Sequence, residues 1–355
     1  MDSVTQFVLG AAVGEATLKG RTSDGPPAFR WGAFWLGGLV GTLPDLDILF
    51  RPFLTGPQAL GFHRGISHSL FFCTAITPFL AWVLSRLFRR SGVSGRRWNL
   101  FVWLALNTHW MLDSLTTYGT QVFLPFSDYP VNVGSLFIID PLYTAPLLAG
   151  LLWTLFASRG DRPYRPRGVR AGLAFSTFYL LLALGSKYAV LARFESSAQA
   201  QGLPYRQMIS VATPFNSILW YGYADTGDDV WVAESSLLDP LDRSLFWQRI
   251  PKGHDQVANF GRGVADRRLL WFSRGFYRLD MVDGQPIFID LRFSRLRSWF
   301  LPIEPAGDDY LFRFALLPPG EGPFNDFRRL RPAGGMEPFP WEIFWRRLLG
   351  RPAQG

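Results

Sequence analysis

The sequence of 355 residues contains a single cysteine, Cys73. One thiol excludes a disulfide framework within the chain and a cysteine-based zinc finger. Charge is also scarce, because Asp, Glu, Lys and Arg make up 18% of the residues, against about 25% in a typical soluble domain. The sequence has no Gly-x-Ser-x-Gly elbow, no Walker phosphate loop and no His-Glu-x-x-His motif. A serine or cysteine hydrolase therefore has little support.

The charge that is present is unevenly distributed. Residues 1–193 hold 17 basic and 9 acidic side chains, whereas residues 194–355 hold 19 of each, so the net charge of +8 lies in the first part. The first part also contains nearly all the long apolar runs. A basic excess between apolar segments is typical of a membrane protein and not of a nucleic-acid-binding face. We therefore expect a membrane-embedded helical domain at 1–193, a second domain at 194–355, and no nucleic-acid partner.

The apolar runs in the first part are long enough to cross a bilayer, which takes roughly 20 residues as a helix. Five stretches qualify, namely 31–50, 66–87, 98–118, 139–158 and 171–192. A shorter stretch at 4–18 is either a sixth span or a re-entrant helix. The sequence thus predicts a multi-pass α-helical domain of about six segments.

Basic residues between these segments fall in alternate loops. Arginines crowd 86–97 and 159–170, and Lys19, Arg21 and Arg30 lie between the first two segments, whereas 120–138 has no basic residue. The positive-inside rule places basic loops in the cytoplasm. With six segments, the residues after 193 then lie outside the cytoplasm.

Ionisable residues within membrane segments are costly and usually functional. In the predicted topology they gather at the outer membrane face. This group comprises Asp2, Asp45, Asp47, His63, His68, His109, Asp113 and Asp140. Because the segments were assigned from hydropathy and loop charge alone, the convergence of these residues is an independent indication of a site.

The spacing of these residues suits metal ligation. His109 and Asp113 are four residues apart and share one face of a helix. Irregular backbone after Pro44 can turn the carboxylates of Asp45 and Asp47 the same way. Imidazole and carboxylate without thiolate suit a divalent ion, with zinc preferred and manganese or iron as alternatives, and a mixed site can hold two or three ions. The predicted ligands are Asp45, Asp47, His63, His68, His109 and Asp113.

Taken singly, each of these residues has a simpler explanation. Asp45 or Asp47 could end a helix at the interface, and a His-x-x-x-Asp pair is often only hydrogen-bonded. Asp140 precedes Pro141 and is typical of a helix N-cap. The metal hypothesis depends on several segments converging.

The ordered motifs MDSVTQ, GTLPDLD, HRGISHSL, HWMLDSLTTYGTQVFLPFS and IIDPLYT resemble the YdjM-like family of inner-membrane, metal-dependent hydrolases. The resemblance covers roughly residues 1–190 and implies a multi-pass protein of the bacterial inner membrane. Gln6 stands where the opening motif of the family usually has a histidine. The ligands that the resemblance implies are Asp45, His63, His68, His109 and Asp113. The His-x-x-x-Asp helix is also similar to the sites of zinc-dependent phospholipases C and nucleases.

A metal ion at this depth would make hydroxide available near lipid headgroups. We therefore expect a hydrolase acting on a phosphoester of a lipid or lipid-linked substrate, with membrane lipids as partners. Arg64 could clamp a phosphate through two parallel hydrogen bonds, although an interfacial anchor is an equal alternative. The candidate catalytic residues are Arg64, Asp47 and Asp2. The alternatives are a non-enzymatic metal-binding membrane protein, such as a transporter or sensor, and a membrane protein whose external domain binds a partner.

After residue 193 the sequence predicts a small α+β extracytoplasmic domain with an antiparallel sheet. Strands are expected at 207–213, 217–224, 229–236 and 310–316, and Asp283-Gly284 signals a hairpin. Short helices are expected at 241–250 and 258–273. The aromatic and basic stretch PFPWEIFWRRLLGR is either an interfacial amphipathic helix or a docked helix.

Overall fold

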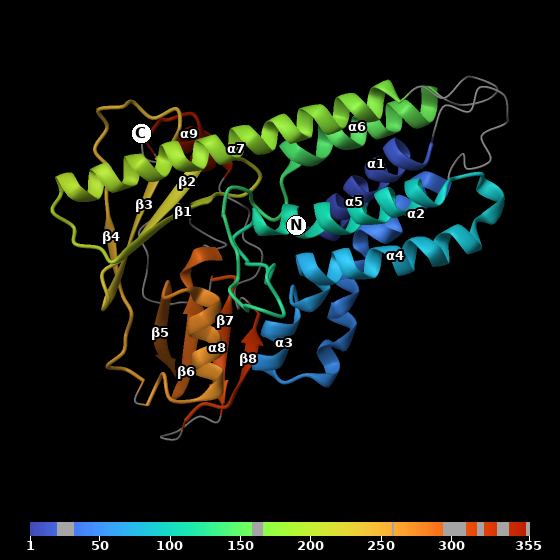
Figure 1. Cartoon of the computed structure of the whole chain (residues 1–355). Helices are drawn as coiled ribbons and strands as arrows, with labels where there is room; N and C mark the ends of the chain where they lie inside the picture. Colours follow the sequence, from blue (N-terminus) through green and yellow to red (C-terminus); the bar gives the residue numbers. More distant parts are fainter. Residues whose placement is uncertain are drawn as a thin grey trace. The chain divides into compact units, whose positions relative to one another are not determined.

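The computed structural model describes residues 1–19, 32–157, 166–257, 259–293, 310–317, 323–331 and 341–352. The chain divides into two compact units, coloured along the sequence in Figure 1. The helical unit comprises Met1–Leu49, Phe62–Leu184 and Pro214–Asn216. The sheet unit comprises Phe50–Gly61, Gly185–Thr213 and Ser217–Gly355.

The helical unit is built from apolar helices around a core that includes the fully buried rings of Trp98 and Phe101. The helical segments are α1 Ser3–Leu18, α2 Gly32–Thr42, η1 Leu43–Phe53, η2 Ile66–His68, α4 Leu70–Leu87, η3 Arg89–Ser91, α5 Gly95–Ser114, α6 Pro141–Ala157 and α7 Arg167–Ala200. Helix α7 runs unbroken out of this unit into the sheet unit (Figure 1). The helical character predicted for residues 1–193 is therefore confirmed.

Among the described residues, three helical stretches are long and apolar enough to cross a membrane. They are Gly32–Phe53, Leu70–Leu87 and Arg167–Ala200, and Pro141–Ala157 is a shorter apolar helix. The expected count of about six spans is not confirmed. Arg21, Arg30, Arg159, Arg162 and Arg165, which entered the orientation argument, lie outside the described residues.

Helices α1 and α2 approach closely through glycine. A Cβ atom at Gly10 would lie 2.3 Å from the carbonyl oxygen of Gly37, and one at Gly41 would lie 2.7 Å from the Cα atom of Gly10. Small residues at such a crossing let two backbones touch, which is typical of helix packing in membranes. The close approach fixes the C-terminal end of α2, and with it the residues that follow, against α1.

The sheet unit contains two four-stranded antiparallel sheets in place of the one expected, with strand orders β1-β2-β3-β4 and β5-β6-β7-β8. The strands are β1 Gln207–Ala212, β2 Leu219–Asp225, β3 Asp229–Ser236, β4 Gln248–Pro251, β5 Tyr277–Val282, β6 Gln285–Asp290, β7 Arg313–Leu317 and β8 Asp326–Leu330. The helical segments assigned to this part are α3 Gly56–Phe62, α8 Val264–Ser273, η4 Leu291–Phe293 and α9 Trp341–Leu348.

The strand predictions for this unit are largely confirmed. The hairpin signal lies at the turn between β5 and β6, where Asp283 and Gly284 both have positive φ, at 50° and 75°. The helix expected at 241–250 is wrong, because this segment is a loop that leads into β4. A side chain from α7 contacts its backbone, since Arg193 donates to the carbonyl oxygen of Arg243 at 3.5 Å.

Candidate metal centre

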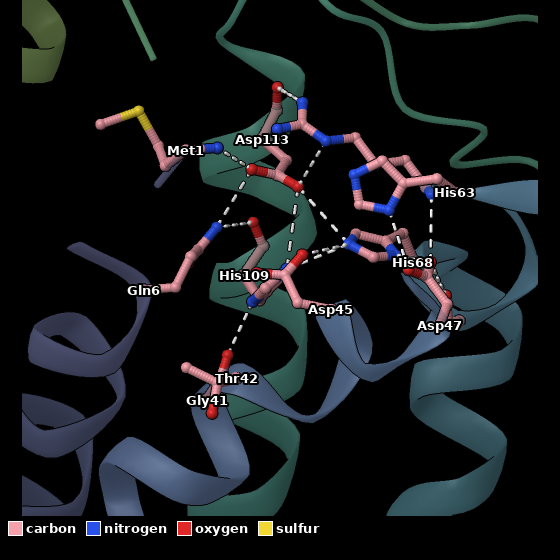
Figure 2. Close-up of polar contacts among 12 residues, drawn as sticks. Met1, Gln6, Gly41, Thr42, Asp45, Asp47, His63, His68, His109 and Asp113 are labelled. Atoms are coloured by element: carbon pink, nitrogen blue, oxygen red, sulfur yellow. Dashed lines mark hydrogen bonds and ion pairs between the residues drawn. The ribbon is translucent and has the colours of Figure 1, made fainter. Parts of the chain in front are cut away.

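Four side chains of the helical unit direct one ligand atom each toward a common point (Figure 2). The group, called the metal centre below, consists of Asp45, His68, His109 and Asp113, whose ligand atoms all lie within 4.8 Å of one another. Asp45 comes from η1, His68 from η2, and the other two from α5. Three are buried and Asp45 is partly exposed. The predicted i, i+4 pair on α5 thus meets residues brought in from two other segments.

The separations of these atoms fit a single metal ion. The two imidazole Nε2 atoms, of His68 and His109, are 3.0 Å apart. Asp45 Oδ1 lies 3.4 Å and 3.5 Å from these nitrogens, and Asp113 Oδ2 lies 3.5 Å and 3.7 Å from them. Four tetrahedral donors at bond lengths of about 2.0–2.2 Å lie about 3.3–3.6 Å from one another. The donor set therefore has the size of a first-row divalent ion.

The hydrogen-bond partners of the two rings define where their protons lie. His109 Nδ1 lies 2.6 Å from the carbonyl oxygen of Gly41, which can only accept, so Nδ1 carries the proton (Figure 2). Ser67 Oγ donates to Asp47 Oδ2 at 2.8 Å and therefore accepts from His68 Nδ1 at 2.9 Å. In each ring Nδ1 is then the donor, which leaves Nε2 as the atom that can bind a metal ion. The two Nε2 atoms lie 3.0 Å apart, so either a shared proton or a metal ion between them is needed to hold them together.

Asp113 is the most enclosed ligand. Its Oδ1 atom accepts from Gln6 Nε2 at 3.1 Å and is ion-paired with the amino group of Met1. Its Oδ2 atom is buried and accepts no hydrogen bond from the described residues, although Arg64 Nε lies 3.1 Å away in an ion pair. A buried carboxylate oxygen left in this way, near the Nε2 atoms of two imidazoles, is a candidate metal ligand.

Comparison with known proteins identifies the family. A family model described as YdjM inner membrane protein matches residues 1–190, more than half of the chain. The chain belongs to the YdjM family of inner membrane proteins. Together with the apolar helices, this membership places the protein in a membrane.

Two curated relatives also match the chain. The chain is 27% identical over 187 residues to the uncharacterized protein YfhP of Bacillus subtilis, which is 51% of either chain. It is 37% identical over 94 residues to the inner membrane protein YbcI of Escherichia coli, which is 26% of this chain and 53% of that protein. The chain thus spans about half the length of the curated relatives it matches. No solved structure matches.

In this YdjM-family chain, the predicted ligands Asp47 and His63 lie beside the metal centre and not in it. Asp47 Oδ1 lies 2.8 Å from His63 Nδ1, and its Oδ2 accepts from the backbone N–H of Arg64 at 3.1 Å. Asp45 and Asp47 are two residues apart on a 3₁₀ helix, so their side chains differ in direction by about 120°. Asp45 faces Nε2 of His68 and Asp47 lies 3.4 Å from its Nδ1. The two carboxylates therefore hold opposite sides of one imidazole.

Arg64 is almost fully buried, with 3% of its surface exposed, and its φ angle is 58°. Its guanidinium group pairs with Asp113, donates to Thr116 Oγ1 at 2.9 Å, and lies over the ring of Tyr118. These contacts hold Arg64 against the ligand-bearing end of α5. Its expected role as a phosphate clamp stays a prediction.

Asp2 and Asp140 are placed at helix starts. Asp2 caps α1 by accepting from the backbone N–H of Thr5 at 3.0 Å. Asp140 accepts from the backbone N–H of Leu142 at 3.0 Å and from the hydroxyl of Tyr179 at 2.8 Å. Neither carboxylate belongs to the metal centre. The catalytic role assigned to Asp2 stays a prediction.

Three groups that the sequence did not single out support the ligands, namely the hydroxyl of Ser67, the carbonyl group of Gly41 and the amino group of Met1. The amide of Gln6, which stands where the family motif usually has a histidine, also contacts a ligand, Asp113. The position of Ser67 directly before His68 is a weak signal, because a hydroxyl there can reach the ring only in a tight turn. The contact of Gly41 has no local signal, because it joins residues 68 positions apart.

Proposed function

We propose that this protein is a membrane-embedded, metal-dependent hydrolase that cleaves a phosphoester of a lipid or lipid-linked substrate. The observation that carries the proposal is the pair of Nε2 atoms of His68 and His109, which face each other at 3.0 Å between two carboxylates. Imidazole nitrogens and carboxylate oxygens gathered in this way are the ligands that a divalent ion requires.

Zinc is the proposed metal. The donor set consists of two imidazoles and two carboxylates whose ligand atoms lie within 4.8 Å of one another, and it contains no thiolate. Zinc binds imidazole and carboxylate ligands in four-coordinate sites, whereas magnesium and calcium prefer six or more oxygen ligands. Manganese and iron are the alternatives, because both bind imidazole and carboxylate.

The residues around the metal centre supply the other requirements of hydrolysis. When bound, a divalent ion supplies Lewis acidity and lowers the pKa of a coordinated water to about 7. Asp45, His68, His109 and Asp113 would hold the ion, and hydrolysis would need a further open position for water or substrate. Asp45, whose side chain is 19% exposed, marks the side from which they enter. His63, whose side chain is 27% exposed, pairs with Asp47. We propose that this pair holds a proton on that side.

The place of the metal centre along the chain favours a lipid substrate. His68 lies two residues before the candidate span Leu70–Leu87, at its N-terminal end. Residues at the ends of spans lie near the depth of the headgroups. A phosphoester in a lipid headgroup or lipid-linked phosphate reaches this depth without leaving the bilayer.

The test is release of phosphate or alcohol by purified protein loaded with zinc, presented with phospholipids and polyprenyl phosphates in mixed micelles. We expect one class of substrate to be turned over, and expect Asp113→Ala to be inactive at equal protein concentration. His254→Ala is the matched control, because His254 is the one histidine in the sheet unit. A fully loaded protein that releases neither product from any of these lipids supports the non-enzymatic alternative, a metal-binding transporter or sensor.

We further propose that the sheet unit lies outside the cytoplasm, following the arginine bias of the loops. A reporter fused after Gly355 decides the side. Alkaline phosphatase activity, which needs export, is the expected result, and green fluorescence of a fused cytoplasmic reporter contradicts the orientation. The metal centre is proposed to open to the same side.

A further inference from the structure

The sheet unit exposes a group of large apolar side chains from two segments, the loop after β3 and the region of α9. This apolar patch comprises Leu238, Leu241, Phe246, Trp341, Trp345 and Leu349. Leu241 is 96% exposed and Phe246 is 82% exposed. Aromatic and aliphatic side chains this exposed and this close in a fold indicate a surface that something apolar covers.

Hydrogen bonds fasten the two segments to each other. Ser236 Oγ donates to the carbonyl oxygen of Leu348 at 2.8 Å. Arg347 donates to both carboxylate oxygens of Asp239, at 3.0 Å and 3.2 Å. The loop and α9 therefore form one surface, and their exposed side chains belong to the same patch.

Helix α9 is apolar on two faces. Phe344 and Leu348 are buried against Leu219, and this contact packs one face of α9 against the sheet unit. Trp341 and Trp345, four residues apart on the other side, are 51% and 53% exposed. A helix that only docks on a sheet has a polar outer face, so the outer tryptophans need another explanation.

The position of the patch along α7 identifies what covers it. Helix α7 is a candidate span that continues without interruption into the sheet unit. A bilayer core takes up roughly 20 residues, so a span that begins after Arg170 ends close to Arg193. Arg193 donates to the carbonyl oxygens of Asp239 and Pro240 at 3.4 Å and 2.7 Å. These bonds hold the loop with its exposed leucines at the level where α7 leaves the hydrocarbon.

The opposite end of the same sheet shows no such feature. Strand β2 pairs Leu219 with Ser236 at the end near the patch, and Asp225 with Val230 at the other. Seven residues at about 3.4 Å each separate these ends by about 20 Å. The turn beyond Asp225 carries the exposed, charged side chain of Asp228. Apolar exposure is thus confined to the end of the sheet that α7 places at the bilayer.

We propose that the apolar patch inserts into the interfacial layer of the leaflet in which α7 ends. Tryptophan, phenylalanine and leucine are the side chains that enter this layer. The charges around the patch balance, because Arg346 and Arg351 are opposed by Asp242 and Glu342. Insertion is therefore driven by apolar burial and does not need anionic lipid. This inference is independent of the chemistry of the metal centre.

Spin labels on the full chain in phosphatidylcholine nanodiscs test the proposal. Labels are attached at Leu241→Cys and Trp345→Cys within the patch and at Asp228→Cys as the matched control on the far end of the sheet. Cys73 is buried, with 1% exposure, so the labelled parent chain measures the background. The readout is the ratio of collision with oxygen, which partitions into lipid, to collision with a water-soluble nickel chelate.

We expect the ratio at residues 241 and 345 to exceed that at residue 228 several-fold. We also expect it to stay the same when anionic phosphatidylglycerol is added. Equal ratios at all three positions would mean that the patch faces water and would overturn the proposal. Low collision rates with both reagents at residues 241 and 345 would mean that protein covers the patch, and would overturn it as well.

Discussion

Two buried polar clusters, one in each unit, handle charge in opposite ways. In the sheet unit, Arg347 pairs with Glu234 and Asp239, and Arg243 pairs with Asp239 at 2.8 Å. Each anion there has a protein cation as a partner. In the metal centre the protein cations reach only Asp113, and Asp45 faces two imidazole nitrogens. The difference separates a buried ion-pair network, in which the protein supplies the cations, from a group of His and Asp side chains that could hold a metal ion.

The cluster of the sheet unit, called the closed cluster below, contains two carboxyl groups whose pKa values are shifted in opposite directions. Burial raises the pKa of Glu234 to about 7, despite its contact with Arg347. Burial also opposes ionisation of Asp239, yet the hydrogen bonds from Arg347 and from the backbone of Ser236 hold its pKa below the usual value. Arg347 therefore stabilises the ionised form of Asp239 more than that of Glu234, and Glu234 is its weaker partner.

The largest expected difference between the two clusters is in the amount of bound metal after substitution. His109→Ala and Asp113→Ala each remove one donor from the metal centre, and we expect bound zinc to fall from about one ion per chain to a tenth or less. Elemental analysis of purified protein measures this. His63→Ala and His254→Ala are the controls and should keep their metal, because neither residue belongs to the four donors. Unchanged metal in both donor variants contradicts the site.

A second prediction concerns the cation that faces the metal centre. Arg64→Lys keeps the charge but cannot contact both Asp113 and Thr116 as the planar guanidinium does. We expect metal to remain bound at saturation, and turnover on a phosphoester substrate to fall about 10–100-fold, the usual loss for groups that orient ligands. Turnover equal to that of the parent would remove Arg64 from the mechanism.

A third prediction uses the weaker partner of the closed cluster. Burial raises the pKa of Glu234 to about 7. The protonated side chain therefore stabilises the fold at pH values below the pKa of the unfolded state. This stabilisation is lost as the pH rises through 7, because the buried carboxyl group must then ionise. Between pH 5 and pH 7 the sheet unit should lose about 2 kcal/mol, and Glu234→Gln should remove this loss. Hydrogen exchange of β2 and β3 amides, corrected for intrinsic rates, measures it.

A second variant for that measurement is Asp239→Asn. Because the pKa of Asp239 is lowered, it is ionised throughout this pH window, so its loss should destabilise the unit at both pH 5 and pH 7. Because the charge of Asp239 also raises the pKa of Glu234, its loss should reduce the difference in stability between these two pH values. A parent protein whose stability does not change between these values contradicts the assignment of Glu234.

The smallest effect is expected at the hydroxyl that orients His68. Ser67→Ala removes the link between Asp47 and His68 Nδ1, so the ring loses the partner that fixes its tautomer. We expect zinc affinity, measured by competition with a chelator, to weaken about tenfold. Ser85→Ala is the matched control, because Ser85 bonds only to the carbonyl oxygen of Trp82 on its own helix. Equal affinities would show that Asp47 holds the ring without Ser67.

The sequence alone determined what depends on short spacing. Apolar length predicted the helices, alternation and the Asp283-Gly284 turn predicted strands, and the interval of four residues placed His109 and Asp113 on one face of α5. Each of these signals lies within a few residues, where the geometry of a helix or hairpin leaves little choice. The ordered motifs of residues 1–190 likewise indicated the family that the comparison established.

Only the tertiary structure decided which candidate ligands meet. Asp45 and Asp47 are equivalent in the sequence, but the 3₁₀ turn of η1 sends them to opposite sides of His68. The proton of His109 is fixed by the carbonyl group of Gly41, which lies 68 residues away and is held there by the packing of α2. The choice of tautomer and of ligand depends on such distant contacts. Because these contacts arise only when separate segments pack together, the local spacing of residues does not predict them.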